Sequence, residues 1–388
     1  MRRNLVVAAL IGAAAYTLVS AAVGRSLRRA VTDARQHDRF VPLVGYGATS
    51  AGEYMDFSAG SFAAHPGPLS IRARSGGDLL RLGAPAVIND QAGLVRRVIE
   101  SGDATRLRRD RAGRLSGHLG ETPADFGLEF SSLKIGNRDA WVIPAERTAT
   151  VWVVHVHGLG SSRSQVLRGL PVFASLGFSS LVPTYRTSLD EGAERARFSH
   201  LGITEWQDVL SAYEYAVSSG AQRIIFVGWS LGASIVLRAL ERGFTPRAAG
   251  ALLVSPALDW REIILEGLSA ARIPSWAAQW MLSGFNLIRT PGEPSISWEQ
   301  MPGISSSQSE LAVPTMVFHG SADRSVPVQL SRKYVSDREI RYVEFSGAHH
   351  TLEWNVSPEA WEETVKAWCR SLGLSVDDEH TVQTLEAK

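Results

Sequence analysis

The feature that most constrains the fold is a serine between two glycines, at the junction of a predicted strand and a predicted helix. Residues 226–232 read FVGWSLG, so Ser230 stands in a Gly-x-Ser-x-Gly pattern. The apolar run 223–227 precedes this pattern and a helix-like run, 233–240, follows it. A serine on such a sharp turn is exposed to a base that can activate its hydroxyl. The context therefore predicts that Ser230 is a nucleophile.

A carboxylate and two histidines follow Ser230 in the order that a Ser-Asp-His triad requires. Asp323 comes just after the buried-strand pattern 313–319, where a carboxylate can hold an imidazole in the correct tautomer. The next strand pattern ends at Phe345 and leads into a loop that contains His349 and His350. One of these two histidines is the predicted general base.

Together these motifs resemble those of the α/β-hydrolase superfamily. Members commonly carry a Gly-Ala-x-His segment after the last strand, and residues 347–350 match it, which selects His350 over His349. In some members the carboxylate comes from an earlier strand, so Asp259 remains an alternative to Asp323. The resemblance implies the triad Ser230, Asp323 and His350.

The resemblance extends upstream to a loop for the oxyanion. The strand-like run 151–157 ends in His157-Gly158-Leu159-Gly160, which is similar to the His-Gly-x-Gly loop of the family. The family pattern implies that the backbone N–H groups of Leu159 and Leu231 bind the oxyanion formed when Ser230 attacks.

The fold class that these motifs imply is α/β, an α/β-hydrolase fold over residues 122–374. Apolar strand patterns alternate with helical ones there, which indicates a mostly parallel sheet with helices on both faces. The alternation lapses over about 256–311, a segment rich in apolar and aromatic residues that include Trp276 and Trp280. We interpret it as a helical cap that shapes a pocket for an apolar acyl group.

Three segments outside the hydrolase-like region are distinguished by their composition. Residues 25–40 are rich in arginine and are expected to form a polar stalk or juxtamembrane helix, whereas 41–121 have the short alternating runs of a small β-rich accessory domain. Residues 375–388 form a polar tail. The extra N-terminal domain resembles that of actinobacterial-type hydrolases.

The first 24 residues are expected to be a targeting or membrane segment. Leu5 to Gly24 are twenty residues without a charge, enough for a helix of about 30 Å that spans the hydrocarbon core. We predict a single-pass membrane anchor with an extracytoplasmic catalytic domain. A cleaved signal peptide, which would yield a secreted protein, is the alternative.

Charge and cysteine content exclude a nucleic-acid partner and two kinds of cysteine site. The chain has 40 basic and 39 acidic side chains, a net charge of +1, and the basic excess lies in the N-terminal segment, so no nucleic-acid partner is expected. Cys369 is the single cysteine, which excludes an intrachain disulfide and a cysteine-based metal site. No cofactor and no metal are expected.

The predicted activity is that of a serine hydrolase, resembling a carboxylesterase or lipase, that cleaves esters of apolar acyl groups through an acyl-enzyme. Its expected substrate is a small-molecule or lipid ester. An aminopeptidase-like amidase uses the same triad, and an acyltransferase differs only in excluding water. A non-catalytic scaffold of the cell envelope is a further alternative.

Overall fold

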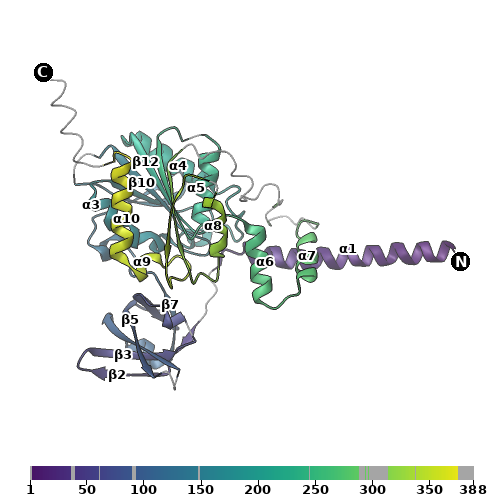
Figure 1. Cartoon of the computed structure of the whole chain (residues 1–388), viewed down its shortest axis with the longest axis horizontal. Helices are drawn as coiled ribbons and strands as arrows, with labels where there is room; N and C mark the ends of the chain where they lie inside the picture. Colours follow the sequence, from purple (N-terminus) through teal and green to yellow (C-terminus); the bar gives the residue numbers. More distant parts are fainter. Residues whose placement is uncertain are drawn as a thin grey trace.

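Two β-sheets organise the chain, one in an N-terminal accessory domain and one in the domain that carries Ser230 (Figure 1). The predicted tail, 375–388, and much of the predicted cap lie outside the described residues. For residues 2–15, 87–89 and 192–194 the backbone alone is described. The computed structural model describes residues 2–35, 40–60, 62–89, 93–146, 149–243, 245–287, 293, 296, 313–336 and 338–374.

The accessory domain is an antiparallel sheet of short strands, in the order β1-β7-β4-β5-β6-β3-β2. Met55, Phe57, Ile71 and Leu82 are fully buried and form its core. The strands and the one α-helix are β1 (Val41–Pro42), β2 (Gly45–Thr49), β3 (Gly52–Ser58), β4 (Leu69–Ala73), β5 (Leu80–Asn89), β6 (Leu94–Ser101), α2 (Thr105–Asp110) and β7 (Ala112–Ser116).

The second sheet has the order β15-β14-β13-β12-β10-β11-β9-β8. The sequence predicted a mostly parallel sheet, and the sheet is mixed. Neighbours are parallel from β15 to β11, but β9 runs antiparallel to β11 and β8 antiparallel to β9, because the hairpin β8-β9 closes this edge. The strands are β8 (Ser131–Ile135), β9 (Arg138–Ile143), β10 (Val151–Val156), β11 (Ser179–Pro183), β12 (Arg223–Trp229), β13 (Ala248–Val254), β14 (Thr315–Gly320) and β15 (Arg341–Phe345).

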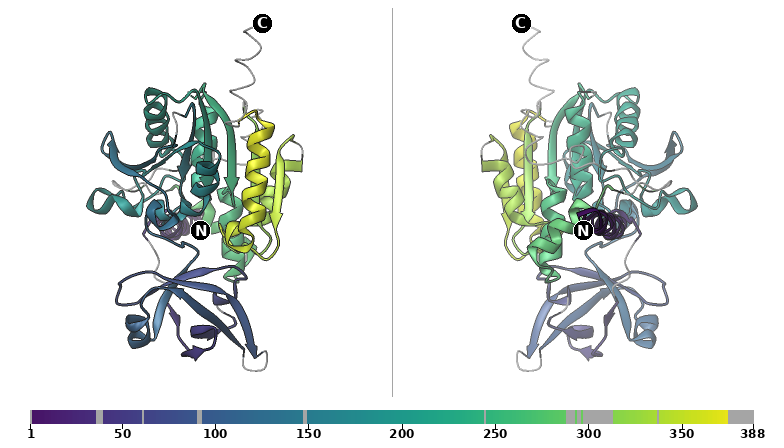
Figure 2. Two further views of the ribbon diagram at one scale, coloured as in Figure 1. Left: turned by 90° about the vertical axis from the view of Figure 1, so that its left-hand side faces the viewer. Right: turned by 90° about the vertical axis from the view of Figure 1, so that its right-hand side faces the viewer.

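Helices cover both faces of this sheet, so its central strands are apolar on both sides (Figure 2). Successive residues of a strand point to opposite faces. In β12, Phe226 belongs to the core under α4, α5 and α8, and its neighbour Ile225 belongs to the core under α3 and α10. The helices are α3 (Leu170–Ser175), α4 (Trp206–Ser218), α5 (Leu231–Glu241), α6 (Trp260–Ala270), α7 (Ser275–Ser283), α8 (Val328–Ser336), α9 (Glu353–Val356) and α10 (Pro358–Ser371), with short 3₁₀ helices at Phe62–Ala64, Pro123–Phe126, Arg163–Gly169 and Leu189–Glu194.

The N-terminal helix α1 (Arg2–Thr32) runs through the segment predicted as a polar stalk. Residues 25–32 are helical, and their arginines bind the catalytic domain. Arg25, Arg28 and Arg29 all pair with the Glu293 carboxylate, at 2.8, 3.0 and 2.6 Å. Arg28 is buried and also donates to the carbonyl of Phe285 at 2.7 Å.

Helix α1 approaches the C-terminal end of α7 closely because Gly24 of α1 and Gly284, the C-cap of α7, lie at the contact. A Cβ on Gly24 would lie 2.0 Å from the Gly284 carbonyl carbon, and a Cβ on Gly284 would lie 1.8 Å from the Ser20 oxygen. Part of the segment predicted as a membrane anchor therefore packs on the catalytic domain. Within the part of the chain that the structure describes, no helix meets the length and apolarity needed to cross a membrane.

Candidate active site

Ser230 lies on a strained turn between β12 and α5. Its backbone has φ 54° and ψ −115°, a positive-φ conformation outside the left-handed helical region that L-residues rarely adopt. The flanking glycines permit this turn. A Cβ on Gly228 would lie 2.5 Å from the Ala233 Cα, and one on Gly232 would lie 2.1 Å from the Val156 oxygen. The turn holds the Ser230 hydroxyl at the carboxyl end of the strand, as the Gly-x-Ser-x-Gly pattern predicted.

Three predicted residues form one hydrogen-bonded chain. The His350 Nε2 atom lies 2.8 Å from the Ser230 Oγ atom, and the His350 Nδ1 atom lies 2.6 Å from the Asp323 Oδ2 atom. Asp323 follows β14 and His350 follows β15, and these strands are neighbours at one side of the sheet. The geometry is that of a nucleophile, a base and a carboxylate that orients the base.

The Asp323 carboxylate is surrounded by donors. The backbone N–H groups of Ser325 and Val326 donate to Oδ1 at 2.7 and 2.9 Å, and the ring of His319 lies 3.2 Å from Oδ2. Burial alone would raise the pKa of Asp323, but the charge of His350 and the hydrogen bonds from both histidines hold this pKa well below its usual range. Asp323 is therefore a fixed negative charge.

That charge acts on the neighbouring base. Burial alone would lower the pKa of His350, but the Asp323 charge and hydrogen bond together raise this pKa above 6.5. The free enzyme must lose a proton from His350 before this imidazole can accept the one from Ser230. Attack by Ser230 should therefore require a pH above the raised pKa of His350.

His349 lies apart from the serine. Its ring centroid is 5.1 Å from that of His65 and 5.6 Å from that of Phe62, both in the accessory domain. Burial lowers the pKa of His349. Of the two histidines on this loop, His350 is the one that the structure brings to Ser230.

The alternative carboxylate has another role. Asp259 is the N-cap of α6, and its side chain accepts from the N–H groups of Arg261 and Glu262 at 3.0 and 3.1 Å. A capping side chain satisfies N–H groups that have no partner within the helix. The Asp259 carboxylate is thus used at a helix end, and Asp323 is the carboxylate that contacts His350.

The predicted oxyanion donors flank the nucleophile. Leu231 is the first residue of α5, so its N–H group has no acceptor within the helix. The loop with Leu159 lies close by, because a Cβ on Gly158 would be 3.1 Å from the Ser230 Cβ. Gln165 fixes this loop, since its Oε1 atom accepts from the Gly158 N–H at 2.6 Å. The backbones of Leu159 and Leu231 therefore both lie near Ser230.

The accessory domain packs on the segment that follows the base, an arrangement that the sequence did not reveal (Figure 1). The amide of Asn355 donates to the carbonyls of Pro68 and Gly117 at 2.7 and 3.1 Å. Arg168, which is fully buried, donates to the Asn355 Oδ1 atom and, at 3.1 Å, to the Thr351 carbonyl. These contacts anchor the base-carrying loop from both domains.

Sequence reasoning also missed polar residues around the triad. Glu353 is fully buried; its Oε1 atom accepts from Ser255 at 2.5 Å, and burial raises its pKa. The Ser255 hydroxyl in turn accepts from the Thr351 N–H at 3.1 Å. No sequence pattern marks Glu353. His319 lies near the end of β14, four residues before Asp323, and this spacing in the sequence was a usable signal.

The tryptophans expected to line an acyl pocket lie elsewhere. The Trp276 side chain on α7 is 74% exposed, and the Trp280 ring lies 6.1 Å from that of Tyr16 on α1. The reason is that α7 packs against α1. The apolar residues Ala257 and Leu258 lie nearer the nucleophile, and the Ala257 N–H donates to the Ser230 carbonyl at 3.3 Å.

Among the residues that the structure describes, no group of three or more His, Cys, Asp or Glu side chains could hold a metal ion.

Comparisons with known proteins cover the catalytic domain. The model of the prolyl oligopeptidase family matches residues 165–372, more than half of the chain, and this range contains all three triad residues. The esterase Pf2001 of Pyrococcus furiosus is similar in structure, with a TM-score of 0.50 and 17% identity over 65% of this chain and 96% of that one. A putative hydrolase from Agrobacterium vitis has a TM-score of 0.46 and 20% identity, over 62% of this chain and 98% of that one. No curated protein sequence matches the chain significantly.

Proposed function

Because the chain belongs to the prolyl oligopeptidase family and is a serine hydrolase, we propose that it cleaves carboxylic esters through an acyl-enzyme on Ser230. The observation that carries the proposal is the hydrogen-bonded chain from Asp323 through His350 to Ser230. These three residues are sufficient to cleave an ester, because the alcohol leaves readily once the Ser230 oxygen has attacked the carbonyl carbon.

The residues have distinct roles in the proposed reaction. Ser230 attacks the ester carbonyl while His350 takes its proton, and the N–H groups of Leu159 and Leu231 bind the oxyanion. His350 then gives the proton to the leaving alcohol. Water attacks the acyl-enzyme with the same base, and Ser230 is regenerated. Asp323 stabilises the imidazolium at each stage.

We propose further that the acyl group is apolar. Support comes from Ala257 and Leu258, which are buried between β13 and α6, and from Trp260, which is buried at the start of α6. The Ala257 N–H donates to the Ser230 carbonyl. Each methylene buried against such a surface contributes up to about 0.8 kcal/mol.

Amide cleavage is the second candidate, and family membership favours it. The two candidates are separated by p-nitrophenyl esters of two to twelve carbons and aminoacyl p-nitroanilides, compared by kcat/KM with the full chain. We expect the esters to be cleaved faster and to show an optimum in acyl length. Faster cleavage of any anilide would replace the ester proposal with an aminopeptidase-like one.

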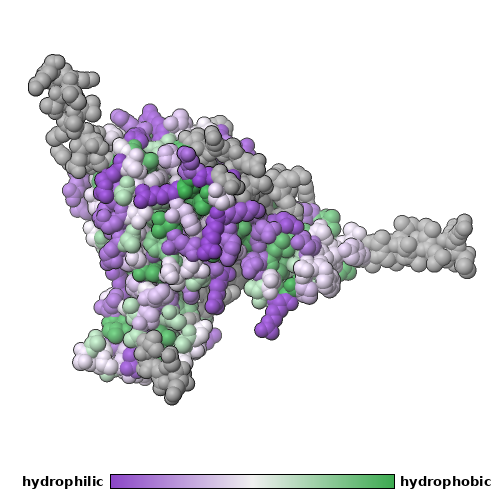
Figure 3. Space-filling view, viewed as in Figure 1, coloured by the Kyte–Doolittle hydropathy of each residue, from purple (hydrophilic) through white to green (hydrophobic). Residues whose placement is uncertain are grey.

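We also propose that residues 5–24 attach the chain to a membrane. Apolar residues gather where α1 leaves α7, and Tyr16, Leu18 and Val19 are 62, 68 and 54% exposed there (Figure 3). The test compares the full chain with a shortened chain that lacks residues 2–15 but keeps the part of α1 that packs on α7. The full chain should remain in membranes through an alkaline carbonate wash, whereas the shortened chain should be released. Release of both, or a natural N-terminus near Ala22, would refute the anchor.

A further inference from the structure

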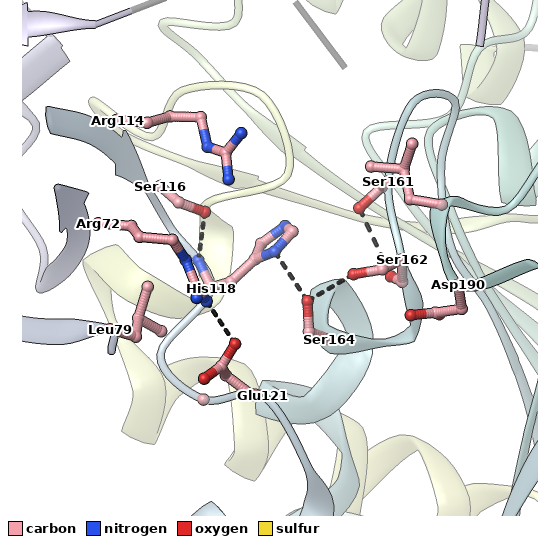
Figure 4. A pocket seen from close by; sticks show the side chains of 12 residues that line it. Arg72, Leu79, Arg114, Ser116, His118, Glu121, Ser161, Ser162, Ser164 and Asp190 are labelled. Atoms are coloured by element: carbon pink, nitrogen blue, oxygen red, sulfur yellow. Dashed lines mark hydrogen bonds and ion pairs between the residues drawn. The ribbon is translucent and has the colours of Figure 1, made fainter. Parts of the chain in front are cut away.

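A polar cavity of about 380 Å³ lies between the accessory domain and the catalytic domain (Figure 4). Its size is within the range of small-molecule sites. Arg72, Arg114 and His118 line it from the accessory domain, and Ser161 and Asp190 are among the residues that line it from the catalytic domain. In Figure 4 the Arg114 guanidinium and the His118 ring extend toward the serines of the catalytic domain.

Two arginines stand side by side on the wall of this cavity. Arg72 in β4 is the register partner of Arg114 in β7, and like charges directly opposite in an antiparallel pair are unfavourable. Glu121, which also lines the cavity, forms an ion pair with Arg72, and the Arg72 Nη1 atom donates to the Gly77 carbonyl at 2.7 Å. Such a pair of guanidinium groups offers forked donors that match a carboxylate or a phosphate.

The carboxylate on the opposite wall already has a cation. Asp190 accepts from the Arg163 N–H at 2.7 Å and from the Arg163 Nε atom at 3.2 Å, so its charge is balanced locally. His118 adds no charge, because burial lowers its pKa to about 3. Its Nδ1 atom lies 3.1 Å from the Ser164 hydroxyl, which in turn is 2.7 Å from the Ser162 hydroxyl.

The composition of the wall also argues against a neutral sugar. Among the described residues that line the cavity there is no Phe, Tyr or Trp on which a sugar ring would stack. The donors are guanidinium and hydroxyl groups, which bind an anion well.

Part of the cavity wall comes from the loop that carries Leu159, the predicted oxyanion donor. Ser161 is two residues beyond Leu159, so their Cα atoms are at most about 7.6 Å apart. Gln165, which holds the Gly158 N–H, directly follows the cavity residue Ser164. The cavity wall is therefore continuous with the loop that lies next to Ser230.

We propose that this cavity binds an anionic group of the substrate, a carboxylate or a phosphate, through Arg72 and Arg114 while the ester bond lies at Ser230. The inference rests on the proposed esterase function and narrows its substrate class to anionic esters. It also assigns a role to the accessory domain, which supplies both arginines.

The test compares charged and neutral esters in matched pairs. In 4-acetoxybenzoate against its methyl ester the charge lies on the leaving group, and in p-nitrophenyl hemisuccinate against the butyrate it lies on the acyl group. We expect Arg114→Gln to lower kcat/KM for the charged member of one pair at least tenfold more than for its neutral partner. The pair that responds tells which side of the ester enters the cavity.

Arg74→Gln is the matched control, because this exposed arginine lies just beyond β4 and outside the cavity. It changes the net charge equally and should leave the ratio between charged and neutral esters unaltered. If Arg114→Gln slows charged and neutral esters alike in both pairs, or if Arg74→Gln shifts the ratio as much, the proposal is overturned.

A binding measurement separates this proposal from the proposed activity. Calorimetry on Ser230→Ala with benzoate and with phenyl phosphate needs no turnover. We expect at least one of the two to bind, and tenfold more weakly once Arg114→Gln is added. Binding without hydrolysis of any ester would refute the esterase function alone, whereas no binding of either probe, or equal binding by both variants, would refute the anion site.

Discussion

Replacing Ser230 with alanine is expected to lower kcat for ester hydrolysis by roughly six orders of magnitude. Removing the nucleophile of a serine triad lowers kcat by about this factor. The physical reason is that the hydroxyl held at 2.8 Å from the His350 Nε2 atom is the only one on the strained turn. Covalent labelling by a fluorophosphonate should also disappear. Turnover of p-nitrophenyl butyrate and labelling of the intact protein measure the two effects.

Ser234→Ala is the control for this change. Ser234 lies on α5 four residues from the nucleophile, is equally buried, and donates to the Ala257 carbonyl at 2.6 Å. Its loss should lower stability slightly, by about 1 kcal/mol, and leave labelling intact. Labelling that persists in a folded Ser230→Ala protein would refute the nucleophile assignment.

Asp323→Asn is expected to reduce kcat by about 10⁴, because an amide favours the wrong tautomer of the base. It also removes the charge that raises the pKa of His350. Since the imidazole must be neutral to accept a proton, the acid limb of the kcat/KM profile should move to lower pH in this variant. Turnover measured from pH 5 to 9 in both proteins checks both effects.

Asp259→Asn is the matched change at the other candidate carboxylate. Asparagine caps a helix about as well as aspartate, so α6 should keep its N-terminus and the protein its stability. Activity and the acid limb should both stay near those of the unaltered protein. A large loss of kcat in Asp259→Asn, with little effect of Asp323→Asn, would exchange the roles of the two carboxylates.

Short-range patterns predicted the parts of the site that depend on local backbone geometry. A Cβ on Gly228 or Gly232 would clash within the turn or with β10, so the glycines that flank Ser230 mark the turn directly in the sequence. Strand patterns likewise located β14 and β15, and with them the loops of Asp323 and His350. Choosing His350 over His349 needed a family resemblance, because both follow the same strand.

Contacts between distant segments could not be predicted in this way. Asn355 meets the Gly117 carbonyl, 238 residues away, and Arg25 meets Glu293 across 268 residues. Nothing in either local sequence specifies the partner. Trp276 and Trp280 show the consequence, since apolar composition suggested an acyl pocket whereas packing on α1 decided where they lie.

The sequence by itself determined the strand–serine–helix turn and the order of nucleophile, carboxylate and base, because backbone strain and strand periodicity are local properties. Only the tertiary structure decided that Asp323 and not Asp259 contacts His350, since that depends on which strand ends lie side by side. It also decided that the arginines after Gly24 bind Glu293, and that Arg72 and Arg114 share a cavity with the oxyanion loop. Burial and charge pairing are settled only when separate segments meet.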